Sequence, residues 1–329
     1  MKLFDVCGMG SALVDILVDV SEERVSELGF KKGSMVLTSA EEQKALLALV
    51  DDGKAKIVSG GSVANSVVAI SQLGGKSALI NRIGQDKYGA IYVEESESQG
   101  VSIVNEPIPG EITGTCVSLI TPDSERTMRT CLATAALLDP NSIKEEAISI
   151  SEWLFIEGYL FANGQQALAA ISKAVSIAKS SATKIAVTCS EPWVISAFSA
   201  QIKEVISQSD LIFANEHEAR ALTETESAEH AFEKLAGDLK NVVVTDGPNG
   251  AYVAWNGDRF HTPAFACTPR DLTGAGDMFA GSFLYGVTHG EDPRKVVRGS
   301  CFLAKEVITR IGARLPEGAR SYWDQSFAS

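Results

Sequence analysis

Short apolar segments alternate with helical segments through the second half of this 329-residue chain, and no other feature restricts its fold as strongly. Residues 241–245 include three consecutive valines, which is typical of a strand buried on both faces. Repeated strand–helix units predict a mostly parallel sheet covered by helices, with ligands bound beyond the carboxyl ends of the strands. The expected strands are residues 153–157, 184–190, 211–214 and 241–245, and the expected helices are residues 165–179, 196–208, 217–222, 276–288 and 293–311.

The first half differs, because its strand-like segments are joined by turns that contain glycine and proline. Residues 12–20, 34–38 and 114–121 have strand character, and residues 62–73 are helical. We expect these strands to form a small separate sheet, which would act as a lid over the ligand end of the core. The predicted α/β core comprises residues 1–10, 41–100 and 131–329, and the predicted lid comprises residues 11–40 and 101–130.

Composition and charge argue against several classes of protein. The net charge is −13 and no Lys/Arg cluster stands out, so we expect no nucleic-acid partner. No apolar stretch is long enough to span a membrane, and the first ten residues, interrupted by Asp5, indicate a buried strand rather than a signal peptide. The six scattered cysteines indicate neither a zinc site nor disulfides and favour a cytoplasmic location.

The strongest motif is Asp-Leu-Thr-Gly-Ala-Gly-Asp at residues 271–277, directly before a long apolar helix. The backbone N–H groups of Gly274, Ala275 and Gly276 can point at an anion, and the helix dipole adds positive potential there. This arrangement suits a phosphoryl group in transfer. Asp277 could accept the proton of an attacking hydroxyl, and the helix start should keep its carboxylate ionised. The simpler interpretation is a glycine-rich helix start.

Residues 60–65, Gly-Gly-Ser-Val-Ala-Asn, carry a second candidate site. Gly61 lets the backbone approach a polyol closely, and the Asn65 amide can both donate and accept hydrogen bonds. An ordinary turn before a helix is the alternative. Asp15 is a lone carboxylate among apolar residues of an expected strand, so it either finds polar partners or faces solvent.

Two further loops follow expected strands. Asn215 and Glu218 come after residues 211–214, and their oxygen atoms suit Mg²⁺, although an Asn helix cap would look the same. Thr245 and Gly247 come after the valine-rich strand, in a loop that could be a plain hairpin turn. Asp246 would repel phosphate, so we expect its side chain to point away.

Residues 271–283 and 60–65 resemble the two signatures of the ribokinase-like (PfkB) family of carbohydrate and nucleoside kinases. They occur in the family's order and at a similar separation, and the resemblance covers essentially the whole chain. It implies a ribokinase-like three-layer α/β sandwich with a mostly parallel central sheet and a small β-sheet lid. It also implies transfer of the γ-phosphoryl group of ATP to a hydroxyl, with Mg²⁺ and, as a further candidate, K⁺.

The resemblance implies a role for each candidate residue. The catalytic set is Asp277 as base, the anion hole of Gly274, Ala275 and Gly276, and Arg126, whose guanidinium would move towards the transferred phosphate. The acceptor would contact Asp15, Gly61 and Asn65. ATP would contact Asn215, Glu218, Thr245, Gly247 and Gly276. Glu218 would hold Mg²⁺ through water, and Asp271 is a candidate for a monovalent cation. Arg129 is interpreted as a surface charge.

The acceptor is less constrained. Residues 10–18, 32–35, 121–128 and 311–316 resemble the bacterial adenosine-kinase-like branch, which favours adenosine, phosphorylated on its 5′-hydroxyl. A free sugar such as ribose or fructose is the alternative. A non-catalytic ligand sensor with a kinase fold is a lower one, because a sensor needs neither Asp277 nor Arg126.

Apolar residues could either sandwich a purine or form lid core. They are Leu13, Met35, Leu37, Phe155, Tyr159 and Phe161. Exposed lid edges could also pair between two chains, so both a monomer and a homodimer are compatible with the sequence.

Overall fold

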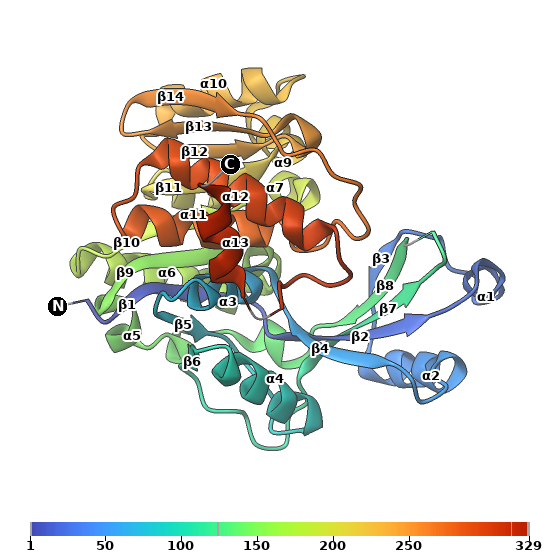
Figure 1. The fold of residues 1–329 in the computed structure, drawn as a ribbon. Helices are drawn as coiled ribbons and strands as arrows, with labels where there is room; N and C mark the ends of the chain where they lie inside the picture. Colours follow the sequence, from blue (N-terminus) through green and yellow to red (C-terminus); the bar gives the residue numbers. More distant parts are fainter. Residues whose placement is uncertain (1, 124, 317, 328–329) are drawn as a thin grey trace.

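The computed structural model describes residues 2–123, 125–316 and 318–327, which form a large layered core and a projecting lid (Figure 1). The core of the described chain is a nine-stranded sheet in the order β14-β13-β12-β11-β10-β9-β1-β5-β6. All strands from β12 to β6 run parallel, whereas β13 and β14 are antiparallel. The strands are β1 (Phe4–Met9), β5 (Ser77–Ile80), β6 (Val101–Ile103), β9 (Ser151–Glu157), β10 (Lys184–Thr188), β11 (Leu211–Asn215), β12 (Val242–Thr245), β13 (Ala251–Trp255) and β14 (Asp258–Thr262).

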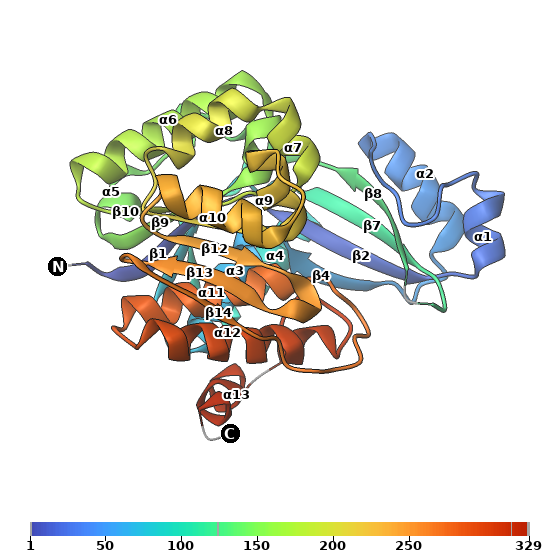
Figure 2. The ribbon, with the colours of Figure 1, turned by 90° about the horizontal axis from the view of Figure 1, so that it is seen from above.

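Helices cover both faces of this sheet (Figure 2), so the predicted three-layer α/β fold is confirmed. On β12, Val242 and Val244 pack into one hydrophobic cluster and Val243 into the other, as the alternation of a doubly buried strand requires. One face carries α3 (Ser62–Gln72), α4 (Lys87–Ser98), α11 (Ala275–Thr288), α12 (Pro293–Ile308) and α13 (Ala319–Ser326). The other carries α5 (Glu145–Ser149), α6 (Gly164–Ser180), α7 (Pro192–Ala197), α8 (Ser199–Ile206), α9 (Glu216–Thr223) and α10 (Ala228–Asp238). Short 3-10 turns occur at η1 (Ala133–Leu137), η2 (Pro140–Ser142), η3 (Gly158–Ala162) and η4 (Gly247–Asn249).

The lid is a second sheet, five-stranded within the described residues, in the order β3-β8-β7-β2-β4. Its strands are β2 (Leu13–Asp19), β3 (Met35–Leu37), β4 (Lys56–Gly60), β7 (Gly114–Ile120) and β8 (Arg126–Cys131). Two helices, α1 (Glu22–Glu27) and α2 (Ala40–Val50), lie beside one face of this sheet (Figure 2). Leu46 of α2 packs there against Ile16 and Val117, so the opposite face is left open.

Two strands lie in a different sheet from the one expected. Residues 41–60 fall within the predicted core, yet α2 packs on the lid sheet, β4 pairs antiparallel with β2, and the chain enters the core only at α3. Residues 101–103 were assigned to the lid, yet β6 pairs parallel with β5 in the core. Both strands are short, three and five residues, so their position depends on pairing that the sequence pattern does not reveal.

The face on which each β8 residue lies follows from strand alternation. Arg126 and Met128 lie on the open face, whereas Arg129 points to the helix-covered face. The Arg129 guanidinium stacks 3.8 Å from the centre of the Phe30 ring, and the residue is only 6% exposed. The prediction that Arg129 is a surface charge is therefore wrong.

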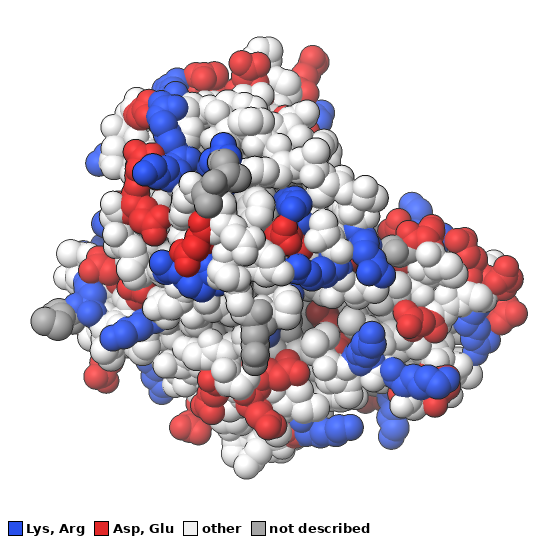
Figure 3. All heavy atoms as spheres, viewed as in Figure 1, with Lys and Arg blue, Asp and Glu red and all other residues white. Residues whose placement is uncertain are grey.

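Figure 3 shows acidic and basic side chains intermixed over one face of the molecule, without a continuous basic area. Among the described residues, no helix is long and apolar enough to cross a membrane. All six cysteines are free thiols, and Cys267 is the exposed one.

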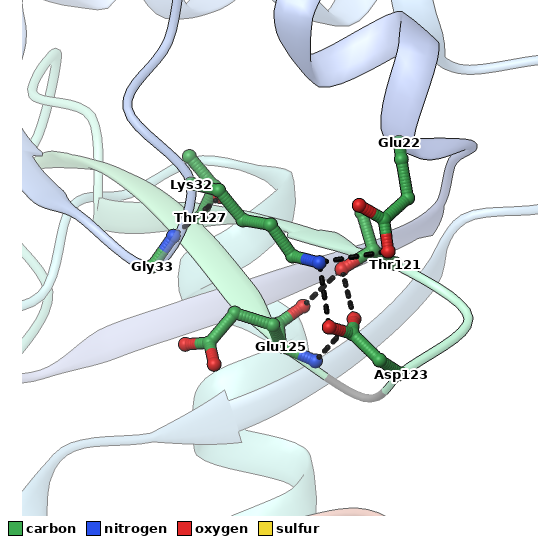
Figure 4. A network of polar contacts seen from close by, with 7 residues as sticks. All are labelled: Glu22, Lys32, Gly33, Thr121, Asp123, Glu125 and Thr127. Atoms are coloured by element: carbon green, nitrogen blue, oxygen red, sulfur yellow. Dashed lines mark hydrogen bonds and ion pairs between the residues drawn. The ribbon is translucent and has the colours of Figure 1, made fainter.

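A network of hydrogen bonds and ion pairs connects the chain segments at the outer end of the lid (Figure 4). Lys32 donates to Glu22 at 2.8 Å and to Asp123 at 2.5 Å, and Thr121 donates to Asp123 at 2.7 Å. The hydrogen bond from Lys32 lowers the pKa of Asp123 to about 2. These contacts tie the segment after α1 to the turn between β7 and β8.

We expect Trp323 of α13 to hold the C-terminal helix against the core. Trp323 is fully buried, and a side chain on Gly299 of α12 would collide with its ring. Trp323→Ala should lower the free energy of unfolding in urea by about 3–5 kcal/mol, because it leaves a large cavity. The control is Trp193→Ala, at a site that is 46% exposed, with an expected loss below about 0.5 kcal/mol. Equal losses in the two variants would contradict this packing role.

Candidate active site

The N-terminus of α11 offers backbone donors to an anion. Gly274 precedes the helix in a left-handed conformation (φ 81°), and no side chain caps the helix start. The first N–H groups of an α-helix lack intrahelical partners, so that of Gly276 is available, whereas that of Ala275 makes a long contact of 3.4 Å with the Leu272 carbonyl oxygen. A side chain at Gly276 would meet nothing within 4 Å, which leaves room for a ligand. The geometry is that of an anion site, and its use for phosphate stays a prediction.

Asp277 lies in the first turn of α11 and faces the first turn of α3. Ser62 Oγ donates to Asp277 Oδ1 at 2.6 Å, and Asn65 Nδ2 donates to Asp277 Oδ2 at 2.9 Å. Burial raises the pKa of Asp277 above its ordinary value, against these hydrogen bonds and the charge of Arg314, which lower it. The expectation that the helix start alone keeps this carboxylate ionised is thus incomplete. A raised pKa makes Asp277 a stronger base.

Gly61 and Asp15 line the neighbouring turn. Gly61 has φ 102°, and a Cβ there would lie 2.2 Å from the carbonyl oxygen of Ser11, so a larger residue does not fit. Asp15 lies against the preceding glycine: a Cβ on Gly60 would lie 2.7 Å from Asp15 Oδ2. Burial raises the pKa of Asp15 to about 6, while Arg126 and Arg314 act to lower it. Asp15 is therefore not the freely solvated carboxylate of the alternative interpretation.

Asp15 borders a hollow of about 340 Å³ between the lid and the core. Its walls come from β2 and β4, from Arg126 and from the segment that follows α12. Polar groups at the hollow include Asp15, Ser59 and Arg314, and apolar groups include Leu17 and Val58. The hollow thus offers both hydrogen-bonding and apolar surface to a small molecule.

Arg126 and Asp271 form an ion pair, so the structure joins two residues for which the family resemblance implies separate roles. Asp271 also accepts from the N–H of Gly312 at 2.7 Å and from that of Thr273 at 3.0 Å. Both carboxylate oxygens of Asp271 therefore already have donors. A cation at Asp271, or Arg126 bound to phosphate, would require this ion pair to open, and both roles stay predictions.

The expected nucleotide side lies at the ends of two neighbouring strands. Asn215 and Thr245 are opposite each other where β11 and β12 end. Asn215 and Glu218 cap α9 reciprocally, through contacts of 2.6–2.9 Å. Gly247 begins the exposed turn into β13, so the loop is also the hairpin turn of the simpler interpretation. Asp246 is buried rather than directed at that surface.

Glu218 is the candidate for a contact with Mg²⁺, and its carboxylate is influenced by the charges of Glu191 and Asp277. Burial, together with the charges of Glu191 and Asp277, raises the pKa of Glu218 to about 7, against the hydrogen bond with Asn215, which lowers it. No group of three or more His, Cys, Asp or Glu side chains in the described residues could cage a metal. Because Mg²⁺ typically keeps several waters and binds through few carboxylates, Glu218 fits the predicted contact through water.

The sequence reasoning missed Glu157, at the end of β9. Its carboxylate accepts from the N–H of Ser11 at 3.2 Å and from the N–H of Val63, in the first turn of α3, at 3.1 Å. Burial raises the pKa of Glu157 to about 7. A lone Glu at the end of an apolar strand was the signal that could have identified it.

Two of the aromatic residues expected near a purine are unavailable. Phe155 and Phe161 are fully buried in the large core, where Phe155 packs edge-on against Phe213. Met35 and Leu37 are exposed on the lid instead.

Glu157→Gln should change how stability depends on pH. The folded pKa of about 7 lies above the ordinary 4.5, so the folded state binds the proton more tightly. This contribution is complete below the lower value and is lost as the pH rises through the folded one. Between about pH 5 and pH 8, the free energy of unfolding should therefore fall less in Glu157→Gln than in the wild type. The control is Glu152→Gln on the same strand, and identical pH dependence in all three proteins would refute the assignment.

The fold and the site together define a kinase that phosphorylates an alcohol group. A helix start suited to an anion, a buried carboxylate beside it and a hollow under a lid lie near the carboxyl ends of a parallel sheet. Residues 35–319 match the model of the pfkB family carbohydrate kinases, and the chain belongs to this family.

Individual relatives agree with the expected branch. The adenosine kinase of Sinorhizobium meliloti is 31% identical, with a TM-score of 0.90 over 98% of this chain and 99% of that one. A probable sugar kinase from Rhizobium etli CFN 42 is 29% identical, with a TM-score of 0.91 and 99% coverage of both chains. The adenosine kinase of Saccharomyces cerevisiae is 25% identical over 338 residues, which span 95% of this chain and 97% of that protein. The predicted family, fold and enzyme class are confirmed, and the family implies ATP as donor, usually with Mg²⁺.

Proposed function

We propose that this kinase transfers the γ-phosphoryl group of ATP to the 5′-hydroxyl of adenosine. The observation that carries the proposal is the position of Asp277: its carboxylate lies at the start of α11, held by Ser62 and Asn65, next to the hollow that contains Asp15. A base beside an anion site and an acceptor hollow is what direct transfer to a hydroxyl requires.

A nucleoside fits the open face of the lid better than a free sugar does. Strand pairing places Leu37, Asp15 and Val58 on one face, in a row that also includes Cys116 and Thr130. Asp15 can accept from ribose hydroxyls, while the apolar members of the row offer a surface to a flat base. A free sugar would leave Leu37 and Val58, which are 56% and 41% exposed, uncovered.

In the proposed mechanism, Asp15 and Asn65 orient the acceptor, and Asp277 takes the proton of its hydroxyl as the γ-phosphoryl group transfers. The N–H groups at the start of α11 stabilise the charge on the phosphoryl oxygens. Mg²⁺ held near Glu218 through water would neutralise phosphate charge. Arg126 would leave Asp271 for the phosphate as the lid closes and water is excluded.

Two other functions remain as alternatives. The similarity to a probable sugar kinase keeps a free-sugar acceptor such as ribose or fructose as the second candidate. A ligand sensor is weaker, because the site retains a buried carboxylate with raised pKa beside a free helix start.

The decisive experiment is an ATP-dependent phosphorylation screen of adenosine, other nucleosides, ribose and fructose. We expect the highest kcat/KM for adenosine. Asp277→Asn should lower kcat by about 10²- to 10⁴-fold, since the amide cannot accept the proton. The control is Asp258→Asn, an exposed carboxylate on β14, which should retain full activity. An Asp277→Asn variant with unchanged turnover, or a protein inactive on the whole panel, would refute the proposal.

The apolar row gives a separate test of the acceptor. Val58→Ser should raise the KM for adenosine by about tenfold, which corresponds to roughly 1.4 kcal/mol of lost apolar burial, and leave the KM for ATP unchanged. The matched control is Val36→Ser, because Val36 pairs with Arg129 and lies on the other face of the lid. If both variants bind adenosine as the wild type does, the base does not lie on this face.

A further inference from the structure

Arg314 joins three elements of the site through its guanidinium. It lies in the segment between α12 and α13, far in sequence from its partners. Its Nε donates to Asn65 Oδ1 at 2.9 Å, and its Nη1 donates to Ser59 Oγ at 2.6 Å. Asn65 in turn donates to Asp277. The side chain therefore connects β4 and α3 to the carboxylate on α11.

The chemistry of its two neighbours fixes the orientation of the Asn65 amide. A guanidinium has only donors, and an ionised carboxylate only accepts. The Asn65 oxygen must therefore face Arg314, and the Asn65 nitrogen must face Asp277. One lone pair and one N–H of the Asn65 amide are thus already used by Arg314 and Asp277, and the remaining lone pair and N–H are the ones left for an acceptor hydroxyl.

The contacts of Arg314 serve the site rather than its own loop. Both of its hydrogen bonds go to residues of the acceptor region, and the residue lines the same hollow as Asp15 and Arg126. Within the described part of the chain, its Nη2 atom is buried and has no hydrogen-bond partner. A residue that only anchored the segment after α12 would instead bond to the backbone of that segment.

We propose that Arg314 is a positioning residue for phosphoryl transfer: it orients the Asn65 amide and thereby holds the Asp277 carboxylate in place for the acceptor hydroxyl. The inference rests on the proposed role of Asp277 and deepens it. It assigns to a residue outside both sequence signatures the task of keeping the base correctly placed.

The positive charge of Arg314 also favours the ionised form of the Asp277 carboxylate. It lowers the pKa of both Asp277 and Asp15, which burial raises. Three carboxylates also interact electrostatically with Asp277: Asp15 on β2, Glu157 on β9 and Glu218 on α9. Arg126 and Asp271 face Asp15 as well, with opposite charges. Loss of Arg314 should therefore leave Asp277 more readily protonated.

The test compares Arg314→Met, Arg314→Lys and the control Arg294→Met, which removes an exposed arginine paired with Asp258. Arg314→Met should lower kcat on the order of 10²-fold and shift the acid limb of the kcat profile to higher pH. Arg314→Lys should restore the acid limb to its wild-type position, because the charge is kept. It should not restore kcat, because an ammonium group lacks the planar pair of donors that holds Asn65 and Ser59. Arg294→Met should match the wild type in both.

A second measurement does not require activity. The Asp277 carboxyl can be titrated by ¹³C NMR and assigned by its loss in Asp277→Asn; its pKa should rise in Arg314→Met and not in Arg294→Met. Ser59→Ala removes one hydrogen-bond acceptor of Arg314 and leaves the arginine charge in place. It should lower kcat severalfold without moving the acid limb of the pH profile. It is also the variant to use if Arg314→Met does not fold. An unchanged Asp277 titration together with an unchanged kcat would overturn the inference. If the wild type phosphorylated no acceptor, the proposed function would fail, while the titration would still decide the role of Arg314.

Discussion

The site depends on the close parallel packing of α3 against α11. A Cβ on Gly281 would lie 2.3 Å from the carbonyl oxygen of Ser66, so the two helix backbones touch there. One turn earlier on each helix, Asp277 meets Ser62 at 2.6 Å. Residues four apart lie on the same helix face, so the two contacts share one register. Both helices therefore start at the same place, and the positive ends of their dipoles face one group of carboxylates.

These carboxylates repel one another when ionised, which disfavours bringing them together. Their raised pKa values also make them stronger bases. Asp15, Glu157, Glu218 and Asp277 all have raised pKa values, with burial as the first cause. Helix starts, backbone N–H groups and arginines offset their repulsion. Of the arginines, Arg126 comes from β8 of the lid and Arg314 from the segment after α12. A lid movement that shifts Arg126 would therefore change the charge balance at the reacting groups.

The sequence was sufficient for the features that depend on local pattern. The doubly buried valine strand, the helix start at 274–277 and the turn at 60–65 are local, and the structure brings the last two into contact. Where the pattern was weak, the expectations were wrong. Strand β4 belongs to the lid sheet, β6 belongs to the core sheet, and Arg129 is buried. Glu157 and Arg314 were missed because their roles depend on partners far away in the chain, such as Val63 and Asn65, which only the folded structure brings near.

The central claim is that Asp277 lies between the acceptor hydroxyl and the phosphoryl group at the start of α11. A crystal structure with adenosine and a non-hydrolysable ATP analogue tests it most directly. We predict the 5′-hydroxyl within hydrogen-bonding distance of the Asp277 carboxylate, about 3 Å, and the γ-phosphate against the N–H groups of residues 274–276. A 5′-hydroxyl out of reach of Asp277, or a γ-phosphate bound away from this helix start, would contradict the account.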